Sequence, residues 1–339
     1  MTPKPCSEFF VASSQKDGGA YRYRLYDNGE AELLCKISMP SPMFLSLSEN
    51  SLWAVLRAPF EDGKESGFAA YDIESGSALL PVNSTKGTVG CHIAVQNGVA
   101  YCANYGSGSI FKAPSTLAPH KGKGTDPTRQ SSPHAHAVGF SLDGTYLLAA
   151  DLGLDTVFVY DLDLTPVSRA RVPCGMGARH FVFSRDGKYL YCANEMGGSV
   201  SVFAWNAPHL TLLSTVCVLP REHTGLGSCA AIKLSKSGEY LYVTERMTES
   251  IVTLRADGEH LSVLARTDSH GKEPRDFTLL ADDRFAVCTN QFADSVSVYS
   301  VDGGIPRYLI SFSLPSPLCA VELFTEKAPS KEHRPTKKA

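Results

Sequence analysis

The chain has 339 residues, of which 43% are hydrophobic and 20% are charged, and its formal net charge is −3 at pH 7. This composition is typical of a globular protein with a large core in one or two domains. It excludes a global basic field of the kind that holds nucleic acid or acidic membranes.

The N-terminal segment, residues 1–10, contains no apolar run long enough for a signal peptide. No later stretch approaches the roughly 20 apolar residues of a membrane-spanning helix. We therefore expect a cytoplasmic protein that binds neither nucleic acid nor a membrane.

The first predicted strands are residues 9–14, 21–27 and 31–37, in which aromatic or β-branched residues alternate with small or polar ones. This unit lacks an obvious innermost strand. From residue 44 onward a single pattern recurs: a strand, a tight polar turn, a second strand, a loop, a third strand and a looser fourth strand. Its copies begin at Phe44, Cys91, His136, His180, Ala230 and Asp276.

The tight turn of these copies carries Asp-Gly, Ser-Gly or Asn-Gly, or the degenerate pair Asp282-Asp283. Such residues tolerate the left-handed backbone of hairpin turns. Equivalent positions recur at intervals of 43 to 51 residues, at Leu52, Val99, Tyr146, Tyr189, Tyr240 and Phe285. A period of roughly 40–50 residues with four strands per unit indicates a β-propeller, and no convincing amphipathic helix favours a solenoid.

The end of the chain supplies the strand that the first unit lacks, in residues 315–323. Pairing the last strand into the first blade removes an exposed edge, so we expect Cys319–Leu323 to complete blade one. The sequence thus predicts an all-β, seven-bladed propeller with four-stranded antiparallel blades in one domain, residues 1–325. A six-bladed ring with an N-terminal extension is the alternative. The polar, basic residues 326–339 are predicted to be a disordered tail.

The ten cysteines include no Cys-x-x-Cys pair, and three of them, Cys102, Cys192 and Cys288, lie in apolar runs predicted to be strands. Free cysteine behaves there as a small hydrophobic residue. We expect buried thiols in a reducing cytosol, with disulfides as the alternative.

The repeat register predicts which polar residues share one face of the ring. In each blade the innermost strand leaves this face, the tight turn lies on the opposite face, and the second strand returns. His136, Arg179 and Arg275 are equivalent at the start of the first strand, with His92 and His180 at or beside that position. At the end of the second strand lie Asn104, Asp151, Asn194, Glu245 and Asn290, with Tyr105 and Glu195 following two of them.

We expect these side chains to converge at one mouth of the central channel. Asp151 and Asn290 are interpreted as residues that close hairpins or bridge blades. Two arginines without a matching excess of acids indicate an anionic ligand, because Arg grips carboxylate or phosphate with two parallel hydrogen bonds.

Several segments occur in the order and spacing of a known family. They are GCHIAV, ANYGSGS, SPHAHAVGFSLDGTYLLAADLGLDTVFVYDLD, GARHFVFSRDGKYLYCANEMGGSVSVF, GKEPRDF and the terminal PSPLC. With them the chain resembles the lactonase family of seven-bladed propellers, strongly from about Cys91 to Cys319 and weakly in the N-terminal blades. Ala178 replaces the family's usual proline. Leu56 and Arg57 stand where Asn-Glu is common, which puts a blade-two carboxylate in doubt.

The family includes 6-phosphogluconolactonases and carboxy-cis,cis-muconate cyclases. The resemblance implies an enzyme, a carboxylic-ester hydrolase that converts 6-phospho-D-glucono-1,5-lactone to 6-phosphogluconate in the pentose phosphate pathway of glucose metabolism. A carboxymuconate-type lactonizing cycloisomerase is the alternative, and a non-enzymatic propeller that binds a partner is a second. The proposed active-site groups of the cyclases fall on His136 or His134, Arg179, Glu195 and Arg275.

We expect Arg179 to stabilise the oxyanion and Glu195 or His136 to act as the base. Arg275 and His180 would hold the substrate anion. The remaining predicted substrate-binding residues are His134, His92, Asn104 and Tyr105.

No cofactor is expected, and the partner would be a small anionic lactone. His134 and His136 share a strand face and could bind a metal, but they lack acidic companions, so no metal site is predicted. We expect a monomer or a weak homo-oligomer.

Overall fold

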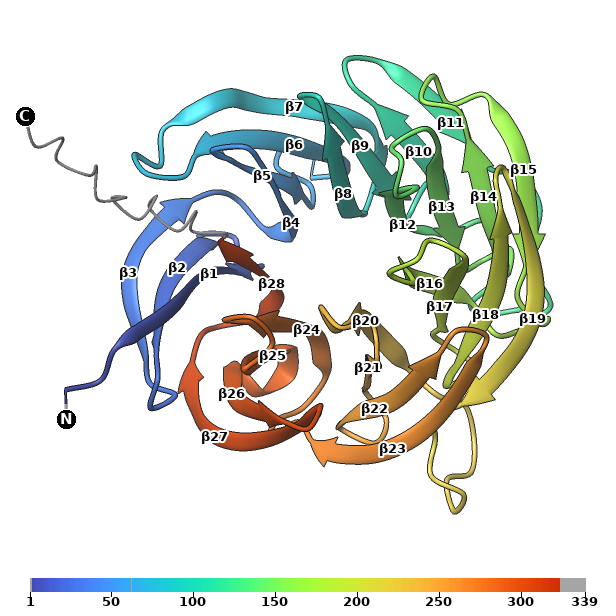
Figure 1. The fold of residues 1–339 in the computed structure, drawn as a ribbon. Helices are drawn as coiled ribbons and strands as arrows, with labels where there is room; N and C mark the ends of the chain where they lie inside the picture. Colours follow the sequence, from blue (N-terminus) through green and yellow to red (C-terminus); the bar gives the residue numbers. More distant parts are fainter. Residues whose placement is uncertain (1, 62, 324–339) are drawn as a thin grey trace, which may run out of the picture.

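Seven four-stranded antiparallel sheets are arranged as blades around a central channel in the computed structural model, which describes residues 2–61 and 63–323 (Figure 1). The predicted seven-bladed propeller is therefore confirmed, and the six-bladed alternative is wrong. The described residues include no α-helix, only a short 3₁₀ turn, η1 (Gln291–Ala293). None of their helices is long and apolar enough to cross a membrane. The predicted tail lies outside the described residues.

The strands of each blade follow one another from the channel outward, except in blade one, whose innermost strand is the last in the chain. The blades and their strands are as follows: blade one, β28 (Pro317–Leu323), β1 (Pro5–Ser13), β2 (Gly19–Tyr26) and β3 (Ala31–Ser38); blade two, β4 (Pro42–Ser48), β5 (Ser51–Leu56), β6 (Glu65–Asp72) and β7 (Ala78–Thr88); blade three, β8 (Gly90–Gln96), β9 (Val99–Asn104), β10 (Ser109–Lys112) and β11 (Thr116–Pro119); blade four, β12 (Ala135–Phe140), β13 (Leu147–Asp151), β14 (Thr156–Tyr160) and β15 (Pro166–Arg171); blade five, β16 (Ala178–Phe183), β17 (Tyr189–Asn194), β18 (Ser199–Asn206) and β19 (His209–Cys217); blade six, β20 (Cys229–Leu234), β21 (Tyr240–Glu245), β22 (Ser250–Asp257) and β23 (His260–Asp268); blade seven, β24 (Pro274–Leu280), β25 (Phe285–Asn290), β26 (Ser295–Asp302) and β27 (Ile305–Ser313).

Blade one closes the ring. β28 pairs antiparallel with β1, and Val11 lies opposite Ala320 in their register. Ser13 Oγ also donates a hydrogen bond to the Pro315 carbonyl at 2.6 Å, next to the junction. The predicted pairing of residues 319–323 with the first unit is confirmed.

The second strands of blades three, five, six and seven begin at the predicted repeat positions. In blade two the strand begins at Ser51, one residue before the predicted Leu52. In blade four it begins at Leu147, one residue after Tyr146. The repeat therefore places the strands to within one residue.

The core of the molecule is divided among the interfaces between blades. Each of seven apolar clusters combines residues from two neighbouring blades, and the one between blades two and three also includes Leu318 of blade one. Between blades four and five, for example, Leu148 and Val157 pack with Leu190 and Phe203. Burying one such side chain contributes about 1.5–3 kcal/mol. Apolar packing therefore joins every pair of neighbouring blades around the ring.

All ten cysteines are free thiols, so the disulfide alternative is wrong. Cys102, Cys192 and Cys288 are buried as predicted, whereas Cys35, Cys174 and Cys217 are exposed. Burial raises the pKa of Cys192 to about 12. Such thiols act as apolar core residues at neutral pH.

Candidate active site

A β-bulge near the start of each innermost strand sets the geometry of the channel. In blade four the pairing shifts between Ala135 and Ala137, which leaves His136 as the extra residue. A bulge of this kind re-aims one side chain. In blade five the extra residue is Arg179, and in blade seven it is Arg275. The corresponding residues of blades one to three are Leu318, Met43 and Cys91.

The bulge residues form a ring with two chemically different sides. Blades one to three contribute Leu318, Met43 and Cys91, whereas blades four, five and seven contribute a histidine and two arginines. All six line one narrow cavity in the channel. The sequence equivalence of His136, Arg179 and Arg275 therefore corresponds to a real structural equivalence.

Above this ring a pocket of about 240 Å³ opens on the face where the second strands end. It is smaller than the ~300–1,000 Å³ of sites for drug-sized ligands, which favours a small substrate. We call it the arginine pocket. Its lining consists of Arg57, Val89, Cys91, Tyr105, Arg129, His136, Glu195, Ser228, Arg246 and Arg275.

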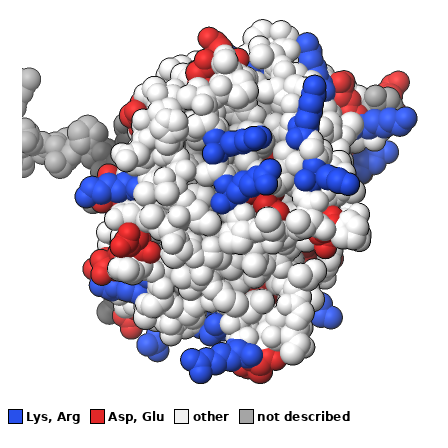
Figure 2. Space-filling model, turned by 90° about the vertical axis from the view of Figure 1, so that its right-hand side faces the viewer, with Lys and Arg blue, Asp and Glu red and all other residues white. Residues whose placement is uncertain are grey.

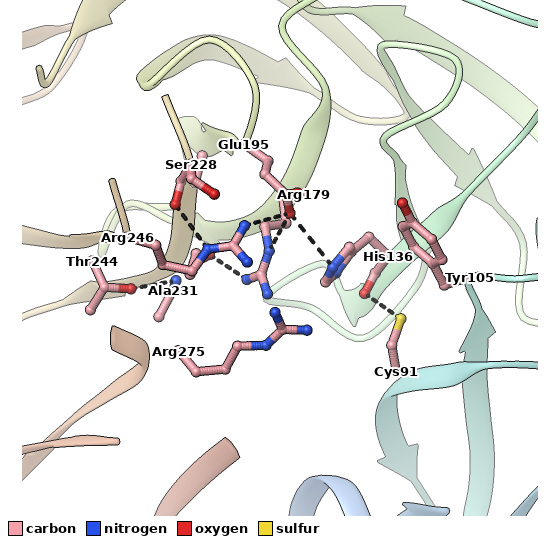
Figure 3. A network of polar contacts seen from close by, with 12 residues as sticks. Cys91, Tyr105, His136, Arg179, Glu195, Ser228, Ala231, Thr244, Arg246 and Arg275 are labelled. Carbon is pink, nitrogen blue, oxygen red and sulfur yellow. Dashed lines mark hydrogen bonds and ion pairs between the residues drawn. The ribbon is translucent and has the colours of Figure 1, made fainter. Parts of the chain in front are cut away.

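Glu195 lies at the centre of an ionic network in this pocket (Figure 3). Its Oε2 accepts a hydrogen bond from Arg179 Nε at 2.9 Å and lies 3.1 Å from Arg246 Nη2. Its Oε1 accepts one from Arg129 Nη2 at 2.6 Å. The carboxylate is 5% exposed, so three guanidinium groups compensate one buried charge.

The arginines determine the charge state of Glu195. Burial alone would raise the pKa of this carboxyl, but Arg246 and Arg179 outweigh burial and hold it well below its usual range. Burial and the neighbouring Arg275 lower the pKa of Arg179 to about 9. Both groups therefore remain charged at neutral pH, and Glu195 is a weak base.

His136 lies beside this network with different properties. Its Nε2 is 4.0 Å from Glu195 Oε2, and its Nδ1 has no hydrogen-bond partner among the described residues. Burial and the positive charge of Arg179 lower its pKa well below 6.5. At neutral pH His136 is thus an uncharged imidazole that can accept a proton.

Arg275 extends toward the middle of the pocket in Figure 3. Its Nη1 is 3.7 Å from Glu273 Oε1, but the same oxygen lies 2.7 Å from Arg246 Nη1. Arg246 also donates from Nε to the Ser228 carbonyl at 3.0 Å. The positive charge of Arg275 is therefore only weakly compensated by nearby carboxylates.

Two further predicted residues form the wall of the pocket at blades three and four. The ring of Tyr105 stacks on His134 with 4.4 Å between centroids and meets His136 edge-on at 5.6 Å. His134 Nδ1 lies 3.0 Å from the Tyr105 carbonyl. Tyr105 lines the pocket, whereas His134 supports it from behind.

His180 and His92 lie deeper in the channel than the sequence suggested. Their rings are 5.1 Å apart, and His92 stacks on Phe44 at 3.9 Å. His180 lines the narrow cavity below the arginine pocket, and His92 lines neither space. The geometry therefore does not favour direct contact between His92 and a ligand in the arginine pocket.

Asn104 was predicted to bind substrate, but its side chain turns away from the pocket, into the interface between blades two and three. It is fully buried and accepts a hydrogen bond from Thr85 Oγ1 at 2.8 Å. Asn194 and Asn290 are also buried, and each donates from Nδ2 to a serine of its own blade, Ser199 at 3.0 Å and Ser297 at 2.9 Å. Successive strand residues point to opposite sides, so Tyr105 and Glu195, which follow Asn104 and Asn194, face the pocket.

Three arginines that line the pocket, Arg57, Arg129 and Arg246, were not among the predicted site residues. Arg246 and Arg57 follow the ends of β21 and β5, as Glu195 follows β17. The repeat register was therefore a sufficient signal for both. Arg129 belongs to the connection between blades three and four, which is longer than the corresponding connections between the other blades.

Two buried side chains hold the connection that carries Arg129. Gln130 Nε2 donates to Asp155 Oδ1 at 2.7 Å, and its Oε1 accepts from the backbone N–H of Thr125 at 3.0 Å. Asp155 also accepts 2.7 Å hydrogen bonds from the N–H groups of Gly175 and Gly177. Asp155 thus ties the Arg129 connection to the segment that leads into Arg179.

Residues 2–61 and 63–323 contain no group of three His, Cys, Asp or Glu side chains with the spacing of a metal site. The pair His134 and His136 has arginines and one arginine-bound glutamate around it. These donors do not suit a divalent cation.

The family model described as Lactonase, 7-bladed beta-propeller matches residues 9–321. The 6-phosphogluconolactonase of Bacillus subtilis strain 168 is 28% identical over 342 residues, which cover 91% of this chain and 96% of that protein. A protein of Staphylococcus aureus strain N315 without a characterised function is 29% identical over 306 residues, covering 84% and 89%.

Two solved structures superimpose on this chain over nearly the whole ring. A protein from Lactobacillus plantarum superimposes with a TM-score of 0.85 at 28% identity, covering 94% of this chain and 99% of that one. The periplasmic gluconolactonase of Pseudomonas aeruginosa superimposes with a TM-score of 0.83 at 26% identity, with the same coverage.

Proposed function

The chain belongs to the lactonase family of seven-bladed β-propellers, and from this membership we propose that it hydrolyses a small anionic lactone. The proposed substrate is 6-phospho-D-glucono-1,5-lactone and the product 6-phosphogluconate. One observation carries this proposal: a small pocket on the channel axis combines a neutral histidine with an excess of arginines. A similar relative is named a 6-phosphogluconolactonase.

In the proposed mechanism His136 is the general base. Its neutral imidazole takes a proton from water as the water oxygen attacks the lactone carbonyl. Glu195 remains an anion throughout, because its arginine partners hold its pKa low, and it stabilises the imidazolium that forms.

Arg179 stabilises the negative charge that develops on the carbonyl oxygen, the task of preorganised donors in acyl transfer. Its position is fixed by Glu195 and by a 2.6 Å hydrogen bond from Nη1 to the Ala230 carbonyl. The tetrahedral intermediate collapses by breaking the bond to the ring oxygen, which takes the proton from His136. The opened product carries a carboxylate, and one proton leaves to solvent. Arg275 holds the anionic group of the substrate.

The test is a pH-stat assay with freshly prepared 6-phosphogluconolactone, run beside a muconolactone, with the spontaneous rate subtracted. We expect hydrolysis of the phosphorylated lactone. Activity on the muconolactone alone would replace this proposal with a cycloisomerase, and activity on neither would favour a binding protein.

Arg179→Ala should lower kcat by on the order of 10²–10³, the cost of one oxyanion donor, while circular dichroism stays unchanged. Arg255→Ala is the matched control, because Arg255 is exposed on blade six and pairs with Glu239 instead of lining the pocket. Near-normal turnover in Arg179→Ala would contradict the assigned role.

A further inference from the structure

The residue that follows the second strand of a blade enters the arginine pocket in four blades. These residues are Arg57, Tyr105, Glu195 and Arg246, from blades two, three, five and six. Glu195 and Arg246 bind each other, and Tyr105 stacks on His134. Arg57 is the member of this set for which the mechanism above has no use.

The backbone of Arg57 is held by a hydrogen bond, whereas its guanidinium group binds no other described residue. Its N–H donates to the Ser41 carbonyl at 3.0 Å, which holds the end of β5. Among the described residues no carboxylate or other acceptor binds its guanidinium group, and the side chain is exposed at the mouth of the pocket. Its charge acts on the Cys91 thiol together with those of Arg179 and Arg275.

The charges around the pocket fall into two groups. Arg129, Arg179 and Arg246 all bind Glu195, and Arg246 also binds Glu273. Arg57 and Arg275 remain, and Arg275 has only the 3.7 Å approach to the shared Glu273. The second group therefore offers nearly two uncompensated positive charges on one pocket.

A phosphomonoester is the anion that fits this pair. It carries about −1.5 to −2 charges at pH 7 and three acceptor oxygens, whereas a carboxylate carries one charge, which Arg275 alone would meet. Arg57 lies at the exposed mouth, so it can reach the end of a substrate that is farthest from the carbonyl near Arg179.

We propose that Arg57 and Arg275 together form a clamp for the phosphate group of the lactone, and that Arg57 makes the enzyme select phosphorylated over unphosphorylated sugar lactones. This inference rests on the proposed lactone hydrolysis. It assigns Arg57 as a specificity-determining residue that touches the phosphate but not the reacting carbonyl.

Steady-state kinetics of Arg57→Gln on 6-phosphogluconolactone and on glucono-1,5-lactone test the clamp. We expect KM for the phosphorylated lactone to rise about tenfold with kcat nearly unchanged, because one charged contact to a remote group is lost. The kinetics on glucono-1,5-lactone should not change. Arg221→Gln is the control, since Arg221 is exposed on the same face but does not line the pocket.

Binding of the product separates this inference from the proposed function. By calorimetry the wild type should bind 6-phosphogluconate more tightly than gluconate, and Arg57→Gln should lose about tenfold in affinity for the first ligand only. If the wild type binds in this way but hydrolyses neither lactone, the proposed function fails and the clamp stands. Equal binding by the wild type and Arg57→Gln, or an equal rise in KM for both lactones, would overturn the clamp.

Discussion

At the level of single residues, His136 carries the proton transfer, whereas Glu195 supplies a fixed negative charge beside it. Glu195 holds a permanent charge because three arginines surround it. His136 stays neutral because it is buried beside Arg179. Both pKa values are lowered, but the Glu195 carboxylate is held in ion pairs, whereas His136 Nδ1 has no partner among the described residues. Sequence alone left either residue as the base, and the ion pairs favour His136.

This assignment predicts an unusual pH dependence. A histidine with a lowered pKa protonates only well below pH 6.5, so kcat/KM should stay level from pH 8 to below pH 6.5 and fall only at lower pH. Arg275→Gln removes one of the charges that lower this pKa, and it should shift the acid limb upward. An NMR titration of His136 checks the same point without substrate. An acid limb at or above pH 6.5 in the wild type would contradict His136 as the base.

At the level of strands and loops, the register of the repeat indicates more residues of the site than the sequence analysis named. The bulge residues His136, Arg179 and Arg275 and the position of Glu195 followed from register alone. Arg246 and Arg57 occupy the same register position as Glu195 but were passed over. Asn104 was assigned to the wrong side of its strand, because the alternation of side chains was not applied at the strand end.

The Arg129 connection is the part of the site that no repeat could reveal. It is irregular from residue 120 to residue 134, and its shape depends on hydrogen bonds between residues far apart in the chain, such as Gln130 with Asp155. Local patterns carry no record of such contacts. A loop of this length without regular structure is commonly functional.

Asp155→Asn should therefore lower activity from outside the pocket. Asparagine tolerates the left-handed backbone of this position, where φ is 50°, but it can satisfy fewer of the N–H groups that Asp155 binds. We expect kcat/KM to fall on the order of 10- to 100-fold through misplacement of Arg129 and Arg179, with the circular dichroism retained.

Asp161→Asn is the matched control for that variant. Asp161 accepts backbone hydrogen bonds in a turn of the same blade, at the opposite face. Equal loss of kcat/KM in both variants would mean that Asp155 acts on the stability of blade four and not on the site.

At the level of the whole molecule, the channel differs in composition from the side of the ring that Figure 2 shows. On the side of the ring formed by blades four and five, basic and acidic side chains are scattered over a largely uncharged surface (Figure 2). The channel instead gathers three histidines, His92, His136 and His180, around Arg179. This crowding of buried imidazoles affects the stability of the whole ring.

Acid should therefore destabilise the fold at a mild pH. Burial lowers the pKa of His92 to about 3 and those of His136 and His180 well below 6.5. Below pH 6.5 the unfolded chain binds protons that the folded chain does not, so the free energy of unfolding falls as pH falls. Each histidine contributes a slope of about 1.4 kcal/mol per pH unit.

Urea unfolding between pH 8 and pH 5 measures this slope. His92→Phe keeps the stack on Phe44 and removes one titrating group. The slope of its unfolding free energy against pH should therefore be lower by about 1.4 kcal/mol per pH unit. Above pH 7 the free energy of unfolding itself should change little. Identical slopes for this variant and the wild type would show that His92 titrates alike in the folded and unfolded chains.

The pairing of β28 with β1 has a consequence for how the molecule is made. β28 follows every other strand of the described residues, so it is the last of these strands to leave the ribosome. Until it arrives, blade one is a three-stranded sheet with a bare edge along Phe9–Ala12, and an open edge of this kind recruits foreign strands. A chain that is cut off after blade seven would lack β28, so its first blade would keep this edge unpaired and its ring would stay open.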